Sequence, residues 1–100
     1  MAFNINPAQE MSVTFTFVFT YDQGKLSERV TYYPNRIAKA LDQPDVIVYA
    51  EFLDAVCERG LFGDEQGNPI SAVEWRERTP DMAWLQGRIY AAVLDHHRPK

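Results

Sequence analysis

The sequence predicts an α+β fold in which an N-terminal antiparallel β-hairpin packs on a C-terminal bundle of three to four short helices. Residues 11–21 alternate between apolar and mostly hydroxyl-bearing side chains with a period of two, which is typical of a strand with one buried face. A turn and a second β-branched stretch follow this strand. From residue 49 onward the apolar residues recur at helical spacing, and Ser, Thr, Pro and Gly stand where helices begin and end.

The size and composition of the chain indicate one small domain. Of its 100 residues, 46% are hydrophobic and 24% are charged, as in globular proteins that build a core without disulfides or metals. Residues 1–10 carry no clear pattern and are expected to form a flexible N-terminal arm, because chain ends fray. An arm that becomes ordered on a partner is the alternative. The domain is therefore expected to span residues 11–100.

The charge balance and the cysteine usage restrict the partners and the compartment. Fourteen acidic and ten basic residues give a net charge of -4, which disfavours binding to nucleic acid or to an anionic membrane. The single cysteine, Cys57, excludes an intrachain disulfide and favours a reducing compartment. The first residues lack the features of a signal peptide, and no apolar run is long enough to span a bilayer. We expect a cytoplasmic protein.

The predicted hairpin joins a strand over residues 11–21 to one over residues 26–33. Asp22 to Lys25 form a four-residue turn in which Gly24 is available for a positive φ. A lone hairpin is only marginally stable, so its aromatic face must pack on helices or on another subunit. The first strand is long and uncharged, with few devices against edge pairing, and so predicts a homo-oligomer.

Two helices are predicted between the hairpin and residue 60. Pro34 ends the second strand, and Asn35 is expected to cap a helix over residues 36–42. Asp45 is expected to cap the next helix, although a later start or an extended first turn is also compatible with the β-branched residues there. Gly60 is expected to end this helix as its C-cap. One face of it would carry Tyr49, Phe52, Leu53, Val56 and Gly60.

The remaining elements are marked by turn and capping residues. Residues 64–68 predict a turn or short hairpin between the apolar residues 61–62 and Ile70. Ser71 and Glu74 form a capping box that opens a helix over residues 72–78. Thr79 is expected to cap the last helix, with Pro80 in its first turn. Its apolar stripe consists of Met82, Leu85, Ile89, Ala92, Val93 and His96.

No group of residues has the spacing that a catalytic or metal site requires. His96 and His97 are adjacent, so on a helix they point about 100° apart and cannot share one metal. Cys57 has no zinc-type spacing around it, and a small buried apolar residue is a better interpretation than a nucleophile paired with His96. We expect no catalytic residue, no metal and no cofactor.

The aromatic content indicates a binding surface. Thirteen aromatic residues in 100 are more than one small core is expected to enclose, and aromatic residues left outside are preferred interface anchors. This favours oligomerisation or partner binding over catalysis. The residues expected to bind a partner are Trp75, Trp84, Leu85, Ile89, Phe17 and Phe19.

The order of these features resembles that of a known family. The sequence VTYYPN (residues 30–35) closes the hairpin, DEQGNPI (64–70) precedes the capped short helix, and TPDMAWL (79–85) opens a last helix that closes with DHHRP (95–99). This order is similar to that of the small tail assembly chaperones of long-tailed phages and prophages. The resemblance covers about residues 13–99.

The resemblance rests on short motifs and includes one departure. Leu61, the G-x-P-I element at residues 67–70 and Arg98-Pro99 match the family pattern, whereas Arg59-Gly60 stands where Trp-Asp is usual. Membership would imply a protein of the host cytoplasm that is absent from the mature virion. It would bind the tape-measure protein and help to recruit tail tube subunits, and many such proteins also exist in a longer, frameshifted form. A groove between the last two helices would take an amphipathic helix of the partner.

Two other classes remain open. A small acidic inhibitor or immunity-type protein has a similar length and lacks motifs, and a small enzyme would depend on Cys57 and the histidines. Neighbouring genes separate the first two classes, because a tail tube gene and a long tape-measure gene favour the chaperone and a toxin gene favours the immunity protein.

Overall fold

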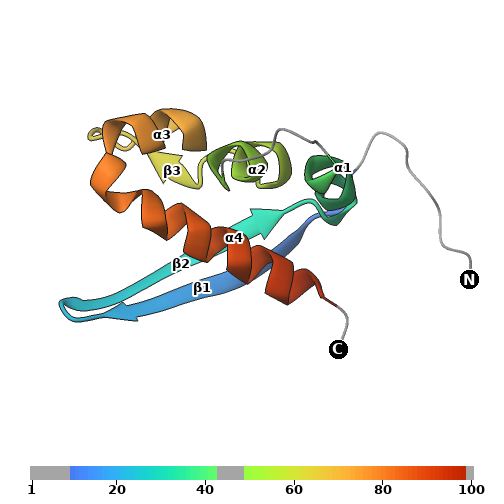
Figure 1. The fold of residues 1–100 in the computed structure, drawn as a ribbon, viewed down its shortest axis with the longest axis horizontal. Coiled ribbons are helices and arrows are strands. Elements are labelled where there is room, and N and C mark those ends of the chain that lie inside the picture. The colour runs from blue at the N-terminus through green and yellow to red at the C-terminus, as the bar shows by residue number, and fades with distance from the viewer. Residues whose placement is uncertain (1–9, 43–48, 99–100) are drawn as a thin grey trace, which may run out of the picture.

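The structure is a computed structural model that describes residues 10–42 and 49–98, and it confirms the α+β fold class. An antiparallel β-hairpin is followed by short helices, as predicted, with a second, very short hairpin between them (Figure 1). The strands are β1 (Val13–Tyr21), β2 (Gly24–Tyr32), β3 (Phe62–Gly63) and β4 (Pro69–Ile70). The α-helices are α1 (Ile37–Leu41), α2 (Tyr49–Val56), α3 (Ala72–Arg78) and α4 (Ala83–His97), and the 3-10 helices are η1 (Pro34–Arg36) and η2 (Pro80–Met82).

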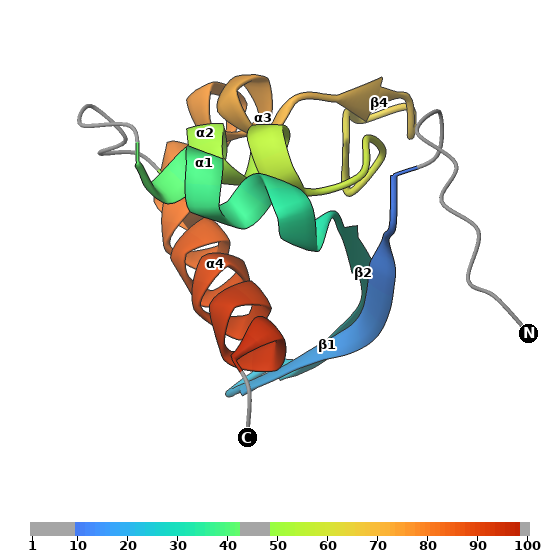
Figure 2. The ribbon, with the colours of Figure 1, turned by 90° about the vertical axis from the view of Figure 1, so that its right-hand side faces the viewer.

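The helices lie on one side of the hairpin. Figures 1 and 2 show α4 crossing one face of the β1-β2 ribbon, while α1, α2 and α3 group together beyond β2. The buried core lies where these elements meet, and α4 closes it through Ile89 and Val93. The core consists of Phe17, Val30, Tyr32, Ile37, Ala40, Ala50, Phe52, Leu53, Val56, Cys57, Phe62, Ala72, Ile89 and Val93. None of the helices in the described part of the chain is both long and apolar enough to cross a membrane.

The turn of the hairpin is shorter than the four residues predicted. Tyr21 pairs with Gly24, so the connection has only two residues, and β2 begins at Gly24 rather than at residue 26. Gly24 has a φ of 146°, which a residue with a side chain adopts at a cost. Phe17 and Val30 are buried on the face turned towards the helices, whereas Thr16 on the opposite face is exposed, as the alternation predicts.

The end of α2 differs from the prediction for a tertiary reason. The helix stops at Val56, and Gly60, with a φ of 104°, belongs to the turn that follows rather than to a C-cap. The backbone beyond α2 pairs with the end of β2 instead: Tyr33 N–H donates to the Val56 carbonyl and Glu58 N–H to the Thr31 carbonyl, both at 2.8 Å. This pairing replaces the helical hydrogen bonds that would have carried the helix further.

Two predicted caps act differently in the structure. Asn35 does not cap a helix; it lies inside η1, which begins at Pro34, and α1 follows at Ile37. The Thr79 hydroxyl donates to the Trp75 carbonyl at 2.6 Å, so it closes α3, and η2 separates it from the start of α4. The predicted cap Asp45 and residues 1–9 of the predicted arm lie outside the described residues.

The last residue of the predicted arm is fixed to the domain. The carboxylate of Glu10 accepts hydrogen bonds from the Arg36 guanidinium, at 2.6 Å from Nη2 and 2.9 Å from Nε. The Arg36 guanidinium also lies 4.2 Å from the centre of the Tyr33 ring. A bidentate ion pair of this geometry holds the chain that enters β1 beside the chain that leaves β2.

Candidate partner-binding surface

An exposed group of aromatic side chains lies where β1 approaches its turn and meets the first turns of α4. Phe19 on β1 is half-buried, and its ring centre lies 5.3 Å from that of Trp84 on α4. The rings of Tyr21 and Phe19 are stacked, with centres 6.5 Å apart. The Arg88 guanidinium lies 5.4 Å from the centre of the Phe19 ring. We call these four residues, Phe19, Tyr21, Trp84 and Arg88, the aromatic surface.

Local sequence spacing places the four side chains together. Phe19 and Tyr21 are two residues apart on a strand, so both point to the face that α4 covers. Trp84 and Arg88 are four residues apart on a helix, so they lie one above the other on the same face. Trp84 remains 47% exposed although its ring packs on Phe19. The surface is therefore held in place and still accessible.

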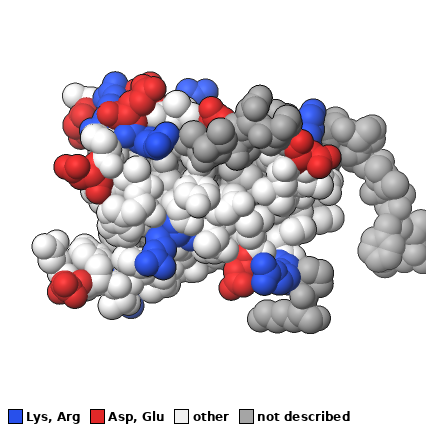
Figure 3. Space-filling model, viewed as in Figure 1, with Lys and Arg blue, Asp and Glu red and all other residues white. Residues whose placement is uncertain are grey.

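The surroundings of this surface carry few charges. Figure 3 shows a mostly uncharged area over α4 and the hairpin, with a positively charged side chain in its middle, whereas positive and negative side chains gather over α3. Arg78 on α3 forms ion pairs there with Glu74 at 2.9 Å and Glu65 at 3.4 Å. A face with few charges that presents Trp, Tyr and Arg has the composition of the centre of a protein interface.

The structure separates the six residues that the sequence predicts as partner-binding. Phe19 and Trp84 are in contact on the aromatic surface, and Leu85 is half-buried next to Trp84 in sequence. Phe17 is 7% exposed and Ile89 is 4% exposed, so both lie in the core.

Trp75 lies in different surroundings from Trp84. It packs against Phe62 of β3, with ring centres 4.9 Å apart.

Sequence reasoning did not select Tyr21 and Arg88 for the aromatic surface. Their signals were present, since Tyr21 continues the aromatic alternation of β1 and Arg88 follows Trp84 by one helical turn.

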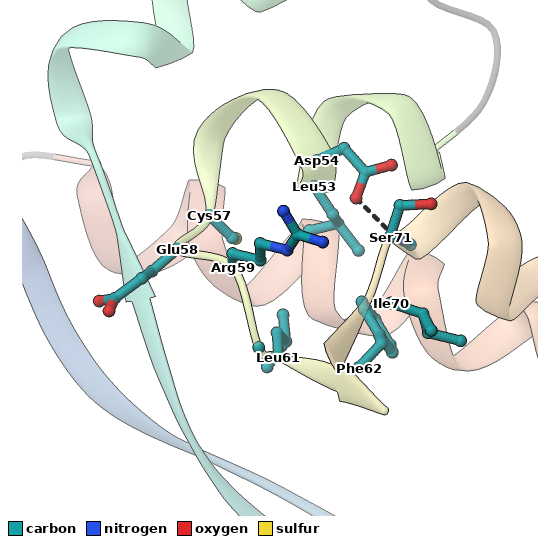
Figure 4. Close-up of a pocket in the computed structure, with 11 residues that line it drawn as sticks. Leu53, Asp54, Cys57, Glu58, Arg59, Leu61, Phe62, Ile70 and Ser71 are labelled. Atoms are coloured by element: carbon teal, nitrogen blue, oxygen red, sulfur yellow. Dashed lines mark hydrogen bonds between the residues drawn. The ribbon is translucent and has the colours of Figure 1, made fainter. Parts of the chain in front are cut away.

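A separate pocket of about 360 Å³ lies between the end of α2 and the β3-β4 hairpin. Its lining residues are Leu53, Asp54, Cys57, Glu58, Arg59, Gly60, Leu61, Phe62, Ile70, Ser71 and Ala72. Figure 4 shows Arg59 extending over the pocket and Glu58 pointing away from it. No residue of α4 lines the pocket, so it is distinct from the groove that the sequence predicts between the last two helices.

The carboxylate of Asp54 in this pocket serves the start of α3. It accepts hydrogen bonds from the backbone N–H groups of Ala72 at 2.5 Å and Val73 at 3.2 Å. The Ser71 hydroxyl accepts from Glu74 N–H at 3.0 Å, as the predicted capping box requires. Three N–H groups in the first turn of α3 are thus satisfied by side chains, and a carboxylate of α2 binds α3 directly.

Cys57 and His96 both have structural surroundings. Burial, together with the negative charge of Asp54, raises the pKa of the Cys57 thiol to about 12, so the thiol stays protonated at neutral pH and is a poor nucleophile. The ring of His96 stacks on Phe15 with centres 4.6 Å apart, and its Nδ1 lies 2.8 Å from the Tyr32 hydroxyl oxygen. His96 therefore joins the last turn of α4 to the hairpin.

The described residues contain no group of three or more His, Cys, Asp and Glu side chains placed to hold a metal ion. No protein-family model matches the sequence, and neither the curated proteins nor the solved structures compared with it give a match.

Proposed function

We propose that this chain is a non-catalytic binding protein whose aromatic surface receives an apolar helix face of a partner protein. The observation that carries the proposal is the pairing of a half-exposed Trp84 with Phe19 on a face with few charges. Trp, Tyr and Arg are the residue types that contribute most to binding at interfaces, and the surface contains all three. Its rings are already packed on one another, so binding would immobilise few side chains.

We propose further that the partner is the tape-measure protein of a long-tailed phage, and that the chain acts as a tail assembly chaperone. In this role it would also help to recruit tail tube subunits, in the host cytoplasm, and would be absent from the mature virion. The support is the resemblance in residues 64–70 and 95–99. Tape-measure proteins are long and largely helical, so an amphipathic helix is the segment that such a surface would meet.

The motif residues that carry the resemblance form a defined turn. Asp64 accepts hydrogen bonds from the backbone N–H groups of Gln66 at 2.9 Å and Asn68 at 2.8 Å, and Gly67 has a φ of 82°. This turn joins β3 to β4 and places Ile70 against the core immediately before α3. The motif thus fits a structural role that supports the helices, with the binding surface elsewhere.

Co-expression with the tape-measure protein from the same genome tests the proposal. Trp84→Ala removes the most exposed ring of the aromatic surface and should weaken capture about 30-fold, as expected for an interface anchor worth about 2 kcal/mol. Leu41→Ala is the matched control, because Leu41 is also half-exposed (49%) but lies on α1. Equal capture by both variants, with folding intact by circular dichroism, would show that the aromatic surface does not bind this partner.

The neighbouring genes provide a second test. A tail tube gene and a very long tape-measure gene beside this one are expected. A toxin gene in their place would assign the surface to an inhibitor or immunity-type protein, with the toxin as the partner to use in the same capture experiment.

A further inference from the structure

The two outer edges of the long hairpin are protected to very different degrees. On β2, the backbone groups near its end pair with residues 56 and 58, and Lys25 and Arg29 place charged side chains along the rest. On β1, residues 11–21 carry no charge, and no described residue outside β2 forms a strand pair with it. Proteins usually protect long edge strands with charges, bulges or a covering segment. The β1 edge has none of these among the described residues.

The hydrogen bonds of β2 show which backbone groups of β1 point away from the hairpin. Thr31 and Tyr33 direct backbone groups away from β1, towards residues 56 and 58. In an antiparallel pair, two residues directly opposite each other turn their backbone groups either both inward or both outward, and the two states alternate. Thr14 lies opposite Thr31. The outward-facing residues of β1 are therefore Thr14, Thr16, Val18 and Thr20.

Exposed apolar side chains lie on this strand and just before it. Met11 is 70% exposed, Val18 is 51% exposed and Tyr21 is 38% exposed. Met11 and Tyr21 are each an even number of residues from Phe15, so on an extended chain they share its face, which α4 covers. Val18 is an odd number of residues away and lies on the opposite face. One neighbouring strand beside β1 would contact all three.

From this edge we propose that β1 pairs antiparallel with the β1 of a second copy of this chain, with Thr16 opposite Thr16. The register then sets Met11 opposite Tyr21, Phe15 opposite Phe17 and Thr14 opposite Val18. The two hairpins form one four-stranded sheet about a two-fold axis, and both copies of α4 lie on the same face. The strand carries no charge, so two identical strands meet without repulsion.

Two alternative registers satisfy the apolar residues less well. If one strand shifts by two residues in one direction, Met11 lies opposite Gln23, which is in the turn. If it shifts by two residues in the other direction, no residue from 10 onward in the other copy lies opposite Tyr21. A shift of one residue would pair outward-facing backbone groups with inward-facing ones. The register centred on Thr16 is the one that covers Met11, Val18 and Tyr21 together.

The expected dimer is weak. Residues 14–18 of the two strands would exchange roughly six backbone hydrogen bonds, and pairing of one edge strand buries less than the ~1,200 Å² of a standard interface. Association in the micromolar range is therefore expected. This inference does not rest on the proposed function, because it is argued from the β1 edge alone, although Tyr21 belongs to both surfaces.

Sedimentation velocity of the purified protein, from nanomolar to near-millimolar concentration, tests the association. We expect a monomer–dimer equilibrium, and Thr16→Lys should raise its Kd about tenfold or more, since it sets two ammonium groups side by side at the two-fold axis. Ser27→Lys is the matched control, on the same exposed face but on β2. A protein that stays monomeric throughout, or a dimer that both variants weaken equally, would overturn the proposal.

Disulfide cross-linking tests the register. Cα atoms of opposed residues in a hydrogen-bonded pair lie about 5.5 Å apart, within disulfide range. Thr16→Cys should cross-link with itself under mild oxidation, and Val18→Cys should do so only when mixed with Thr14→Cys. Cross-linking of Val18→Cys alone, faster than that of Thr16→Cys, would refute this register. Absence of the dimer with unchanged capture of the tape-measure protein would remove only this inference.

Discussion

Replacement of Asp54 by alanine should loosen α3 from α2. The Asp54 carboxylate accepts hydrogen bonds from two backbone N–H groups at the start of α3, at 2.5 and 3.2 Å. Loss of an N-terminal cap costs about 1 kcal/mol, and hydrogen bonds to charged groups cost more. Asp54 is exposed and water can replace part of the interaction, so we expect about 1–2 kcal/mol of lost stability. For a domain of this size that corresponds to roughly 4–16 °C in Tm.

Urea denaturation followed by tryptophan fluorescence measures this effect. Trp75 lies on the helix that Asp54 caps, so its emission reports loss of α3 packing. Glu58→Ala is the matched control, because it removes the same charge nearby from a side chain that points away from the pocket. Asp54→Asn retains one acceptor oxygen and should lose about half as much stability as Asp54→Ala.

Combination with Ser71→Ala sharpens the test. Ser71 caps Glu74 N–H, in the same helix turn as the two N–H groups that Asp54 binds, so the two losses should couple by about 0.5 kcal/mol or more. If Asp54→Ala were no less stable than Glu58→Ala, the reasoning that a carboxylate of α2 secures the start of α3 would be wrong.

Three further outcomes follow from the described contacts. Tyr32→Phe removes the hydroxyl bonded to His96 and should cost about 1 kcal/mol in thermal unfolding, whereas Tyr33→Phe should leave Tm unchanged. The Cys57 thiol, with a pKa raised by burial to about 12, should react far more slowly with a disulfide reagent in the folded protein than in urea; equal rates would contradict its burial. Backbone hydrogen bonds lower the pKa of Asp64 below its ordinary value of 3.8, so its stabilisation should be present above that pH and lost as the pH falls through the folded pKa. The stability difference between the unaltered protein and Asp64→Asn, measured by urea denaturation, should therefore shrink on acidification.

Elements with strong local signals were predictable from the sequence. The alternation over residues 11–21 gave β1, and the Ser71–Glu74 capping box gave the first residue of α3. These signals are local because the side chains that define the structure lie within a few residues of the backbone groups they serve.

Features that depend on distant partners were not predictable. Gly60 has the backbone conformation expected of a C-cap, but α2 ends at Val56 because residues 56–58 pair with the end of β2. Likewise, no local pattern shows that Trp84 meets Phe19 while Trp75 meets Phe62, since this depends on how the helices turn about their axes. Four of the six predicted partner-binding residues lie outside the aromatic surface, because tertiary packing decides which side chains a strand or helix buries: Phe17, Trp75, Leu85 and Ile89.

The bond between Tyr32 and His96 links residues 64 positions apart, and this separation affects the order in which the protein can fold during synthesis. The hairpin is complete on the ribosome once residue 32 has emerged, yet its aromatic face waits for α4. At about 5–20 residues per second, the intervening chain takes roughly 3–13 seconds to make. During that interval Phe15, Phe17 and Phe19 have no helix to cover them. The nascent chain should therefore be most prone to aggregation and to chaperone binding before α4 emerges.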